Sequence, residues 1–134
     1  MKEKFYLDTN LIVSYFCNRN KKQYELAKEL FTKAKQKNIE LVLLSEIVIE
    51  VEYSLNKHYG YNREQIQIEL LSLAKSQYIY IDHREAVIQA INLYCLTTID
   101  LVDCILYSKA KADNAEVLSF DTDFKKLKKK SPLS

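Results

Sequence analysis

Two patterns of hydrophobic positions succeed one another along this chain. Short apolar runs at residues 5–7, 39–44, 78–81 and 116–120 are bounded by polar or turn-forming residues, which predicts buried strands. Between these runs, apolar residues recur at helical spacing with charged residues in the remaining places, as in residues 24–37. Such spacing puts the apolar side chains on one face of a helix. The order of the two patterns therefore predicts strands that alternate with helices.

Polar residues at the edges of the apolar stretches predict where helices begin and end. We expect Ser45, Asn62, Asp82 and Thr98 to cap four helices, and Asn62 to form a reciprocal capping box with Gln65. The remaining helices are expected at residues 11–16, at residues 24–37 and after Asp123. The expected helix ends are Asn18, Asn38, residues 58–61 and Asn114.

Strands that alternate with helices form right-handed crossovers, which pair the strands in parallel and cover both faces of the sheet. We therefore predict that the 134 residues form one α/β domain over residues 1–134. Its expected fold is a three-layer α/β/α arrangement with a central, mainly parallel sheet. Ligands bind such sheets beyond the carboxyl ends of the strands. Asp8 and Asp121 follow the first and last expected strands, so we expect both at that edge.

Composition narrows the class of protein. Hydrophobic residues make up 48% of the chain and charged residues 28%, and no apolar run approaches the roughly 20 residues that a membrane span needs. Residues 1–4 lead directly into the first strand without a signal segment, so we expect a cytoplasmic protein. Cys17, Cys95 and Cys104 are widely spaced among apolar neighbours, which favours reduced core thiols over disulfides or a zinc site.

Positive charge is concentrated at the C-terminus. The net charge is +2, but five lysines lie within residues 125–130, so the rest of the chain is mildly acidic. One interpretation is that residues 125–134 form a basic, frayed and solvated tail. The other is that the tail contacts the phosphate backbone of a nucleic acid. In the second case, the candidate contacts are Lys125 and Lys126, with Arg19, Lys21 and Lys22 on the opposite rim.

Each of four apolar segments has an acidic residue at its end or one helical turn beyond it. These acids are Asp8, Glu50, Asp103 and Asp121. An unpaired acid in an apolar setting is costly, so four of them suggest a shared site. Two simpler interpretations stay open: Asp8 alone also fits a helix N-cap, and Glu46 with Glu50 fits an exposed acidic stripe.

A metal ion would explain such a gathering of acids. Asp100 and Asp103 are three positions apart, so both project from one side of a helix whose other residues are apolar and expected in the core. Carboxylates brought together repel one another unless a cation neutralises them. Oxygen ligands suit Mg²⁺ or Mn²⁺, which keep positions open for water and a phosphate oxygen. We therefore expect a site that hydrolyses phosphodiesters.

At these acids the chain resembles the PIN-domain nucleases, and most closely the single-domain VapC-type toxin ribonucleases of toxin–antitoxin pairs. The stretches that carry the resemblance are Tyr6-Leu7-Asp8-Thr9-Asn10, residues 45–55, residues 100–106 and residues 118–124. They span nearly the whole chain in the order of the family. The resemblance implies an Mg²⁺-dependent endoribonuclease that is inhibited by a cognate antitoxin protein and is commonly a homodimer.

The resemblance also implies roles for particular residues. The catalytic acids would be Asp8, Glu50, Asp103 and Asp121, of which Asp8, Asp103 and Asp121 would hold the metal. The supporting positions would be Asn10, Asp100, Ser119 and Asp123, and Asp123 is also the alternative to Asp121 as the fourth acid. Glu46, Glu52 and Asp82 match no acid of the family.

Two other functions stay open at this point. One is a PIN-domain nuclease that processes RNA and is not a toxin, which the candidate acids do not distinguish from a toxin. The other is a binding module that keeps the fold without catalysis, which metal-dependent cleavage of RNA would exclude. An aromatic cluster at Tyr53, Tyr59 and Tyr61, which we expect to be exposed, marks a candidate surface for a homodimer.

Overall fold

The computed structural model describes residues 2–131, and the strands in that part of the chain form one parallel sheet. The strands are β1 (Glu3–Tyr6), β2 (Ile39–Leu43) and β3 (Ile79–Ile81), in the order β1-β2-β3. Phe5 lies opposite Leu41, and Leu41 lies opposite Ile79. The first three predicted strands and their parallel pairing are therefore confirmed.

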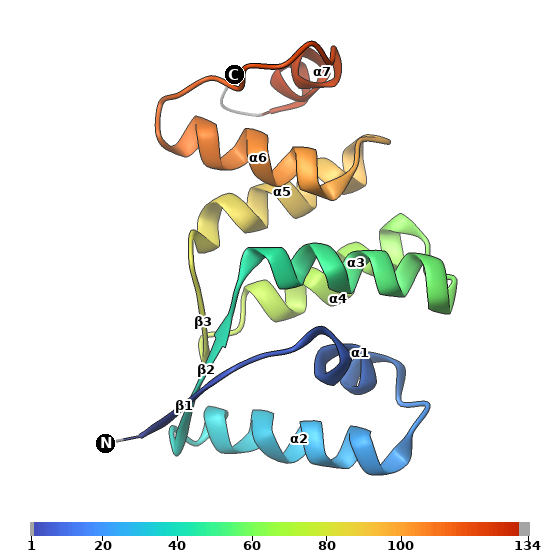
Figure 1. Cartoon of the computed structure of the whole chain (residues 1–134), viewed down its shortest axis with the longest axis vertical. Helices are drawn as coiled ribbons and strands as arrows, with labels where there is room; N and C mark the ends of the chain where they lie inside the picture. The colour runs from blue at the N-terminus through green and yellow to red at the C-terminus, as the bar shows by residue number, and fades with distance from the viewer. Residues whose placement is uncertain (1, 132–134) are drawn as a thin grey trace.

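The described residues also form helices at all the predicted places. These are α1 (Thr9–Cys17), α2 (Lys21–Lys35), α3 (Ser45–Tyr59), α4 (Arg63–Ala74), α5 (Arg84–Leu96), α6 (Leu101–Ala112) and α7 (Asp123–Lys130). Figure 1 shows α1 and α2 at one end of the molecule, α6 and α7 at the other end, and α3 and α4 between them. This order separates the first residues of the chain from the last.

Two predicted helix boundaries are formed as the sequence indicates. The Asn62 side chain accepts a hydrogen bond from the Gln65 N–H, and the Gln65 side chain accepts one from the Asn62 N–H, which completes the capping box of α4. Gly60 ends α3 with a positive φ of 70°. This left-handed conformation is easy for glycine because it has no Cβ.

Ser45 does not cap α3 as predicted. Leu44 occupies the cap position, and Ser45 is the first residue of the helix. The Ser45 hydroxyl is instead buried and accepts a hydrogen bond from Lys109 Nζ at 2.7 Å. The Ser45 side chain therefore contacts α6 and does not cap α3.

The predicted caps of α5 and α6 are also wrong. His83, with a φ of 57°, precedes α5 in place of Asp82. Asp100 precedes α6 in place of Thr98. The Thr97 hydroxyl accepts a hydrogen bond from the Ile99 N–H at 3.2 Å, which forms a local turn before the helix begins.

The predicted strand at residues 116–120 is not formed. Leu118 and Phe120 are almost fully exposed, at 98% and 108%. The Ser119 hydroxyl accepts a hydrogen bond from the Asp121 N–H, and an Asp121 carboxylate oxygen accepts one from the Asp123 N–H, both at 2.9 Å. These local bonds turn the chain into α7, and a strand is stable only when a neighbouring strand pairs with it.

Strand β1 lies at the edge of the sheet. Its four residues are exposed, in contrast to the predicted buried strand, and Tyr6 is 65% exposed. Within residues 2–131, β1 pairs with β2 on one side only. The core is formed instead by β2, β3 and the helix faces packed on them, and Leu41, Leu43 and Ile79 are among its fully buried residues.

The basic C-terminal segment is ordered as far as it is described. Leu127 is fully buried, and Lys111 Nζ donates a hydrogen bond to the hydroxyl of Ser131, which is also buried. The lysines of residues 125–130 therefore project from a helix that is attached to the core. Residues 132–134 of the predicted tail lie outside the described residues.

The predictions from composition can also be compared with the structure. Cys17, Cys95 and Cys104 are free thiols; of the three predicted core thiols, Cys104 is buried, whereas Cys17 and Cys95 are partly buried. Cys104 is fully buried, and burial raises its pKa to about 12. None of the helices within residues 2–131 combines the length and the apolar character that crossing a membrane requires.

Candidate active site

Three aspartates meet where α6 passes the start of α7. Asp103 lies on the first turn of α6, Asp121 precedes α7, and Asp123 is the first residue of α7. One carboxylate oxygen from each lies within 4.8 Å of the others. We call Asp103, Asp121 and Asp123 the aspartate cluster.

The electrostatics of the aspartate cluster are unfavourable without a cation. Burial raises the pKa of Asp103 above its ordinary value, and the negative charges of Asp100, Asp121 and Asp123 raise it further. Lys126 Nζ lies 3.5 Å from an Asp123 carboxylate oxygen, but that lysine is largely exposed. An exposed ion pair of this kind contributes little, so most of the repulsion in the cluster is not offset.

The helix that carries Asp103 is less buried than predicted. Leu101, Cys104 and Ile105 are buried, as expected, but Val102 and Leu106 are 50% and 49% exposed. These two residues are four positions apart and therefore share one face of α6. Asp103 lies beside that face and is half-buried, so its carboxyl group is open to solvent and to ligands.

A second group of candidate residues lies where α1 meets α3. Asp8 has the backbone position of an N-cap, but its side chain makes no capping hydrogen bond, so its carboxylate stays free. Thr9 Oγ1 donates a hydrogen bond to Glu50 Oε2 at 2.9 Å. Asp8, Glu50 and Asn10 are exposed. The sequence interpretation missed Thr9, although its place directly after a candidate acid was a signal.

Asp8 and Glu50 are not members of the aspartate cluster. Among the described residues, Asp103, Asp121 and Asp123 are the group of acids whose ligand atoms all lie within 4.8 Å of one another. Figure 1 shows α3 and α4 between α1 and the end of the molecule that carries α6 and α7. The structure brings Asp103, Asp121 and Asp123 together, and α3, the helix that carries Glu50, packs against α6.

The supporting residues and the basic residues are placed around these two groups. Ser119 is attached to the backbone of Asp121 through its hydroxyl, and Asp100 caps α6 through its backbone only. The guanidinium of Arg19 lies 4.4 Å from the centre of the Tyr59 ring. The exposed basic side chains near the two groups are Arg19, Lys21 and Lys22 beside α1, and Lys125 and Lys126 on α7.

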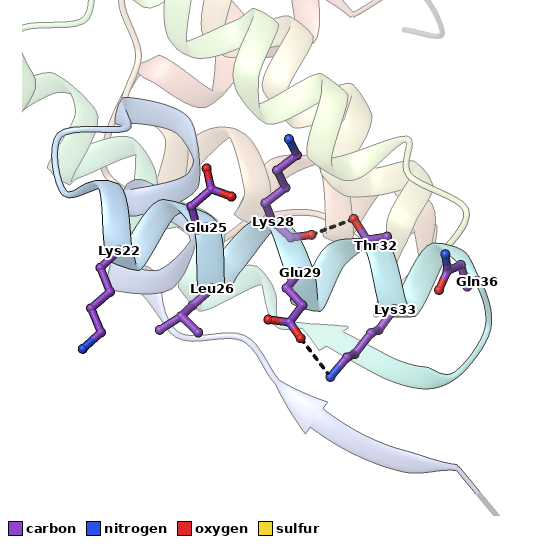
Figure 2. Close-up of a pocket in the computed structure, with 8 residues that line it drawn as sticks. All are labelled: Lys22, Glu25, Leu26, Lys28, Glu29, Thr32, Lys33 and Gln36. Carbon is purple, nitrogen blue, oxygen red and sulfur yellow. Dashed lines mark hydrogen bonds and ion pairs between the residues drawn. The ribbon is translucent and has the colours of Figure 1, made fainter.

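Among the described residues that line it, a separate surface pocket has no cluster of acids that could hold a metal ion. It lies along the outer face of α2, and its lining side chains come from that helix or the residue directly after it, as Figure 2 shows. The interactions drawn are the Glu29–Lys33 ion pair at 3.3 Å and the hydrogen bond from Thr32 to the Lys28 carbonyl. One helix face cannot enclose a ligand, so we do not place the active site there.

The residues of the aspartate cluster fit a divalent cation. Carboxylate oxygens are the ligands that Mg²⁺ and Mn²⁺ prefer. The three aspartates offer such oxygens within 4.8 Å of one another, and burial together with the charges of Asp100, Asp121 and Asp123, which a cation would offset, raises the pKa of Asp103. Asp103, Asp121 and Asp123 are therefore the residues of this structure that could hold the metal.

Comparison with known proteins places the chain in a family. The model of the PIN domain matches residues 5–130. The chain belongs to the PIN domain family, and its α/β fold with a parallel sheet agrees with that. A VapC ribonuclease of Aquifex aeolicus (strain VF5) is 29% identical to it over 122 residues, which cover 90% of each protein. No solved structure matches the chain significantly.

Proposed function

We propose that this chain is a metal-dependent endoribonuclease and the toxin of a type II toxin–antitoxin pair. The observation that carries the proposal is the aspartate cluster, in which three carboxylates lie within 4.8 Å of one another. The similarity to a protein named VapC ribonuclease supports RNA as the substrate and a role as a toxin. The proposed cofactor is Mg²⁺ or Mn²⁺, held by Asp103 and Asp121 with Asp123 beside them.

The proposed reaction is hydrolysis of a phosphodiester. A bound divalent cation polarises the phosphate and makes water more acidic. The water oxygen bonds to phosphorus and the bond from phosphorus to the 3′ oxygen breaks, which leaves a 5′-phosphate and a 3′-hydroxyl. We assign the proton released by the water to Glu50 Oε1, because Thr9 already donates to Glu50 Oε2. The 3′ oxygen takes its proton from solvent.

The proposed catalytic state joins Asp8 and Glu50 to the aspartate cluster. Strand β1 has an edge without a strand partner among the described residues, and residues 116–120 are unpaired. Parallel pairing of these two segments would bring Asp8 and Asp121, which follow them in sequence, to the same edge of the sheet. It would also cover part of Tyr6, Leu118 and Phe120, which are exposed.

The toxin role implies a protein inhibitor. An antitoxin segment with an Arg or Lys side chain among the carboxylates of the cluster would replace the metal as the neutralising charge. Charge complementarity supports this arrangement because no strong cation partner lies beside Asp103 in the described residues. A homodimer and a cytoplasmic location stay predictions.

Metal binding tests the aspartate cluster. Calorimetry should detect Mn²⁺ binding to the wild-type chain and lose it for the Asp103→Asn, Asp121→Asn variant. The matched control is Asp82→Asn with Asp113→Asn, which removes the same charge from exposed positions outside the cluster. Equal binding by all three proteins would show that the cluster is not the metal site.

Expression in a bacterium tests the toxin role. The wild-type chain without an inhibitor should arrest growth, and the Asp103→Asn variant at the same soluble level should not. Unaffected growth with active enzyme would favour an RNA-processing nuclease. Absence of any metal-dependent RNA cleavage would leave the binding module as the remaining function.

A further inference from the structure

A hollow of about 360 Å³ lies between α1 and α3, and Asp8 is one of the residues that line it. Its lining includes Asn10 from α1, and Ser54, His58 and Tyr59 from the last two turns of α3. We call it the Tyr59 hollow. It is separate from the aspartate cluster, and neither the family match nor the named relative assigns it a ligand.

The side chains of the Tyr59 hollow are suited to a flat polar ring. Asn10 has an amide that both donates and accepts, Ser54 has a hydroxyl, and His58 has two ring nitrogens. Within residues 2–131, no hydrogen bond uses these three side chains. The guanidinium of Arg19 lies over one face of the Tyr59 ring and His58 makes an edge contact with Tyr53, so an unsaturated ring would stack on the parts of these two rings that remain open. The hollow therefore offers hydrogen-bonding groups that the protein itself leaves unused, beside two aromatic rings that are partly covered.

The rim of the Tyr59 hollow carries positive charge. Arg19 lies with its guanidinium 4.4 Å from the centre of the Tyr59 ring and is exposed to solvent. Asn18, with a φ of 47°, ends α1 and turns the chain so that Arg19 reaches that ring. Lys21 and Lys22 follow at the start of α2 and are also exposed. A phosphate next to a ring bound in the hollow would meet these cations.

We propose that the Tyr59 hollow binds one unpaired base of an RNA strand and that Arg19 binds a phosphate of the same strand. The inference rests on the proposed function, because it names a subsite for the substrate of that reaction. Bases in duplex RNA are stacked and their edges lie in grooves, whereas bases of single strands can be turned out, stacked on aromatic rings and read by polar side chains. The occupant is therefore a single-stranded nucleotide rather than a duplex.

The test compares RNA with and without bases. The probes are fluorescein-labelled oligouridine, an abasic ribose-phosphate oligomer of the same length, and the same oligouridine paired with oligoadenosine. Binding is measured by anisotropy in EDTA with the Asp103→Asn variant as background, so that no cleavage occurs. Oligouridine should bind about 5- to 150-fold more tightly than the abasic oligomer, the range expected for one stacked base, and more tightly than the duplex.

Substitutions then locate the base. Tyr59→Leu should remove most of the preference for oligouridine over the abasic oligomer, and Tyr80→Leu, on an exposed tyrosine of β3, should not. Ser54→Leu, which fills the hollow from α3, should act like Tyr59→Leu and replaces it if that variant fails to fold. Arg19→Gln should lower the salt dependence by about 0.7 while the base preference stays.

The outcomes separate this inference from the proposed function. Equal base preference in Tyr59→Leu, Ser54→Leu and the background protein would overturn the hollow as a base site, even if the wild-type chain cleaves RNA. Base-dependent binding without any metal-dependent cleavage would overturn the nuclease proposal and keep the base site. No RNA binding at all would overturn both.

Discussion

Thr9 and Glu50 connect the first residue of α1 to the middle of α3 through a hydrogen bond of 2.9 Å, from Thr9 Oγ1 to Glu50 Oε2. Asp8 directly precedes Thr9, so this bond links Glu50 to the segment that carries a second candidate catalytic acid. A carboxylate on an exposed helix face otherwise has several side-chain conformations. We infer that Thr9 restricts the Glu50 side chain to the conformation that accepts this hydrogen bond.

The first prediction concerns this bond. Thr9→Val removes the hydroxyl and keeps the shape of the side chain, and should lower kcat for RNA cleavage about 10- to 100-fold with little change in KM, as loss of a hydrogen bond to a metal-site group does elsewhere. Thr9→Ser keeps the hydroxyl and should restore most of the rate. Equal rates for the two variants would mean that Glu50 does not depend on Thr9.

The second prediction concerns Asp103 in the metal-free protein. Burial and the charges of Asp100, Asp121 and Asp123 raise its pKa in the folded state. The folded state then binds more protons than the unfolded state, so this group lowers stability at neutral pH and the loss disappears as the pH falls below the unfolded pKa. Asp103→Asn should therefore raise the melting temperature at pH 7 and have little effect near pH 3.

Thermal unfolding in EDTA at both pH values measures this difference. Asp113→Asn, on an exposed aspartate after α6, is the control and should change neither value. A large fall in the melting temperature of Asp103→Asn at pH 7 would instead show that Asp103 stabilises the fold through a cation partner.

The third prediction concerns Arg63, which connects α4 to the entry of α6. Its guanidinium donates hydrogen bonds to the carbonyls of Tyr94 and Ile99 and lies 3.7 Å from the centre of the Tyr94 ring. Arg63→Ala should lower the free energy of unfolding by about 2–4 kcal/mol, because it leaves two carbonyls without their donor. Lys57→Ala, on an exposed position of α3, should change it by less than about 0.5 kcal/mol.

Urea denaturation of the wild-type chain and of each variant measures these changes in the free energy of unfolding. Arg63→Lys should lose nearly as much as Arg63→Ala, since one ammonium group cannot reproduce the fork of the guanidinium. A loss below about 1 kcal/mol for both Arg63 variants would show that the loop before α6 is held by other contacts.

The fourth prediction concerns the lysines of α7. They are exposed and follow the aspartate cluster directly: Lys125, Lys126, Lys128, Lys129 and Lys130. Their replacement by Gln should weaken binding of single-stranded RNA and reduce its salt slope by up to about 3.5, because each phosphate contact releases counterions. Affinity for Mn²⁺ should change little.

The matched control replaces five exposed lysines elsewhere, which are Lys28, Lys33, Lys35, Lys37 and Lys75. That variant has the same net charge and should keep a steeper salt slope than the α7 variant. The same slope for both variants would mean that the lysines of α7 are solvated and do not contact RNA.

Local signals were enough to predict most of the fold. Strands β2 and β3 and the helices could be predicted because their apolar spacing and their end residues agree, as at the Asn62–Gln65 capping box. The caps predicted at Ser45 and Thr98 are not formed. The Ser45 hydroxyl accepts a hydrogen bond from Lys109 instead, and the Thr97 hydroxyl forms a turn with the Ile99 N–H before α6 begins. These depend on partners that local sequence does not reveal.

The candidate site was predictable as a set of acids but not as an arrangement. Asp103, Asp121 and Asp123 meet in space because α6 and α7 pack together, and the resemblance had named all three. The strand at residues 116–120 has the expected pattern, but pattern alone does not supply the neighbouring strand that it needs. Thr9 was missed because its partner, Glu50, is far away in sequence and close only in the fold.

The central claim is that this chain hydrolyses RNA with a metal ion held by its carboxylates, and the ends of the RNA products test it most directly. Purified wild-type chain should cleave bulk RNA with Mg²⁺ or Mn²⁺, lose the activity in EDTA, regain it on readdition of metal, and leave 5′-phosphate and 3′-hydroxyl ends. Asp103→Asn, purified in parallel, should be at least about 100-fold slower. Products with 2′,3′-cyclic phosphate ends, or equal cleavage in EDTA, would contradict the account.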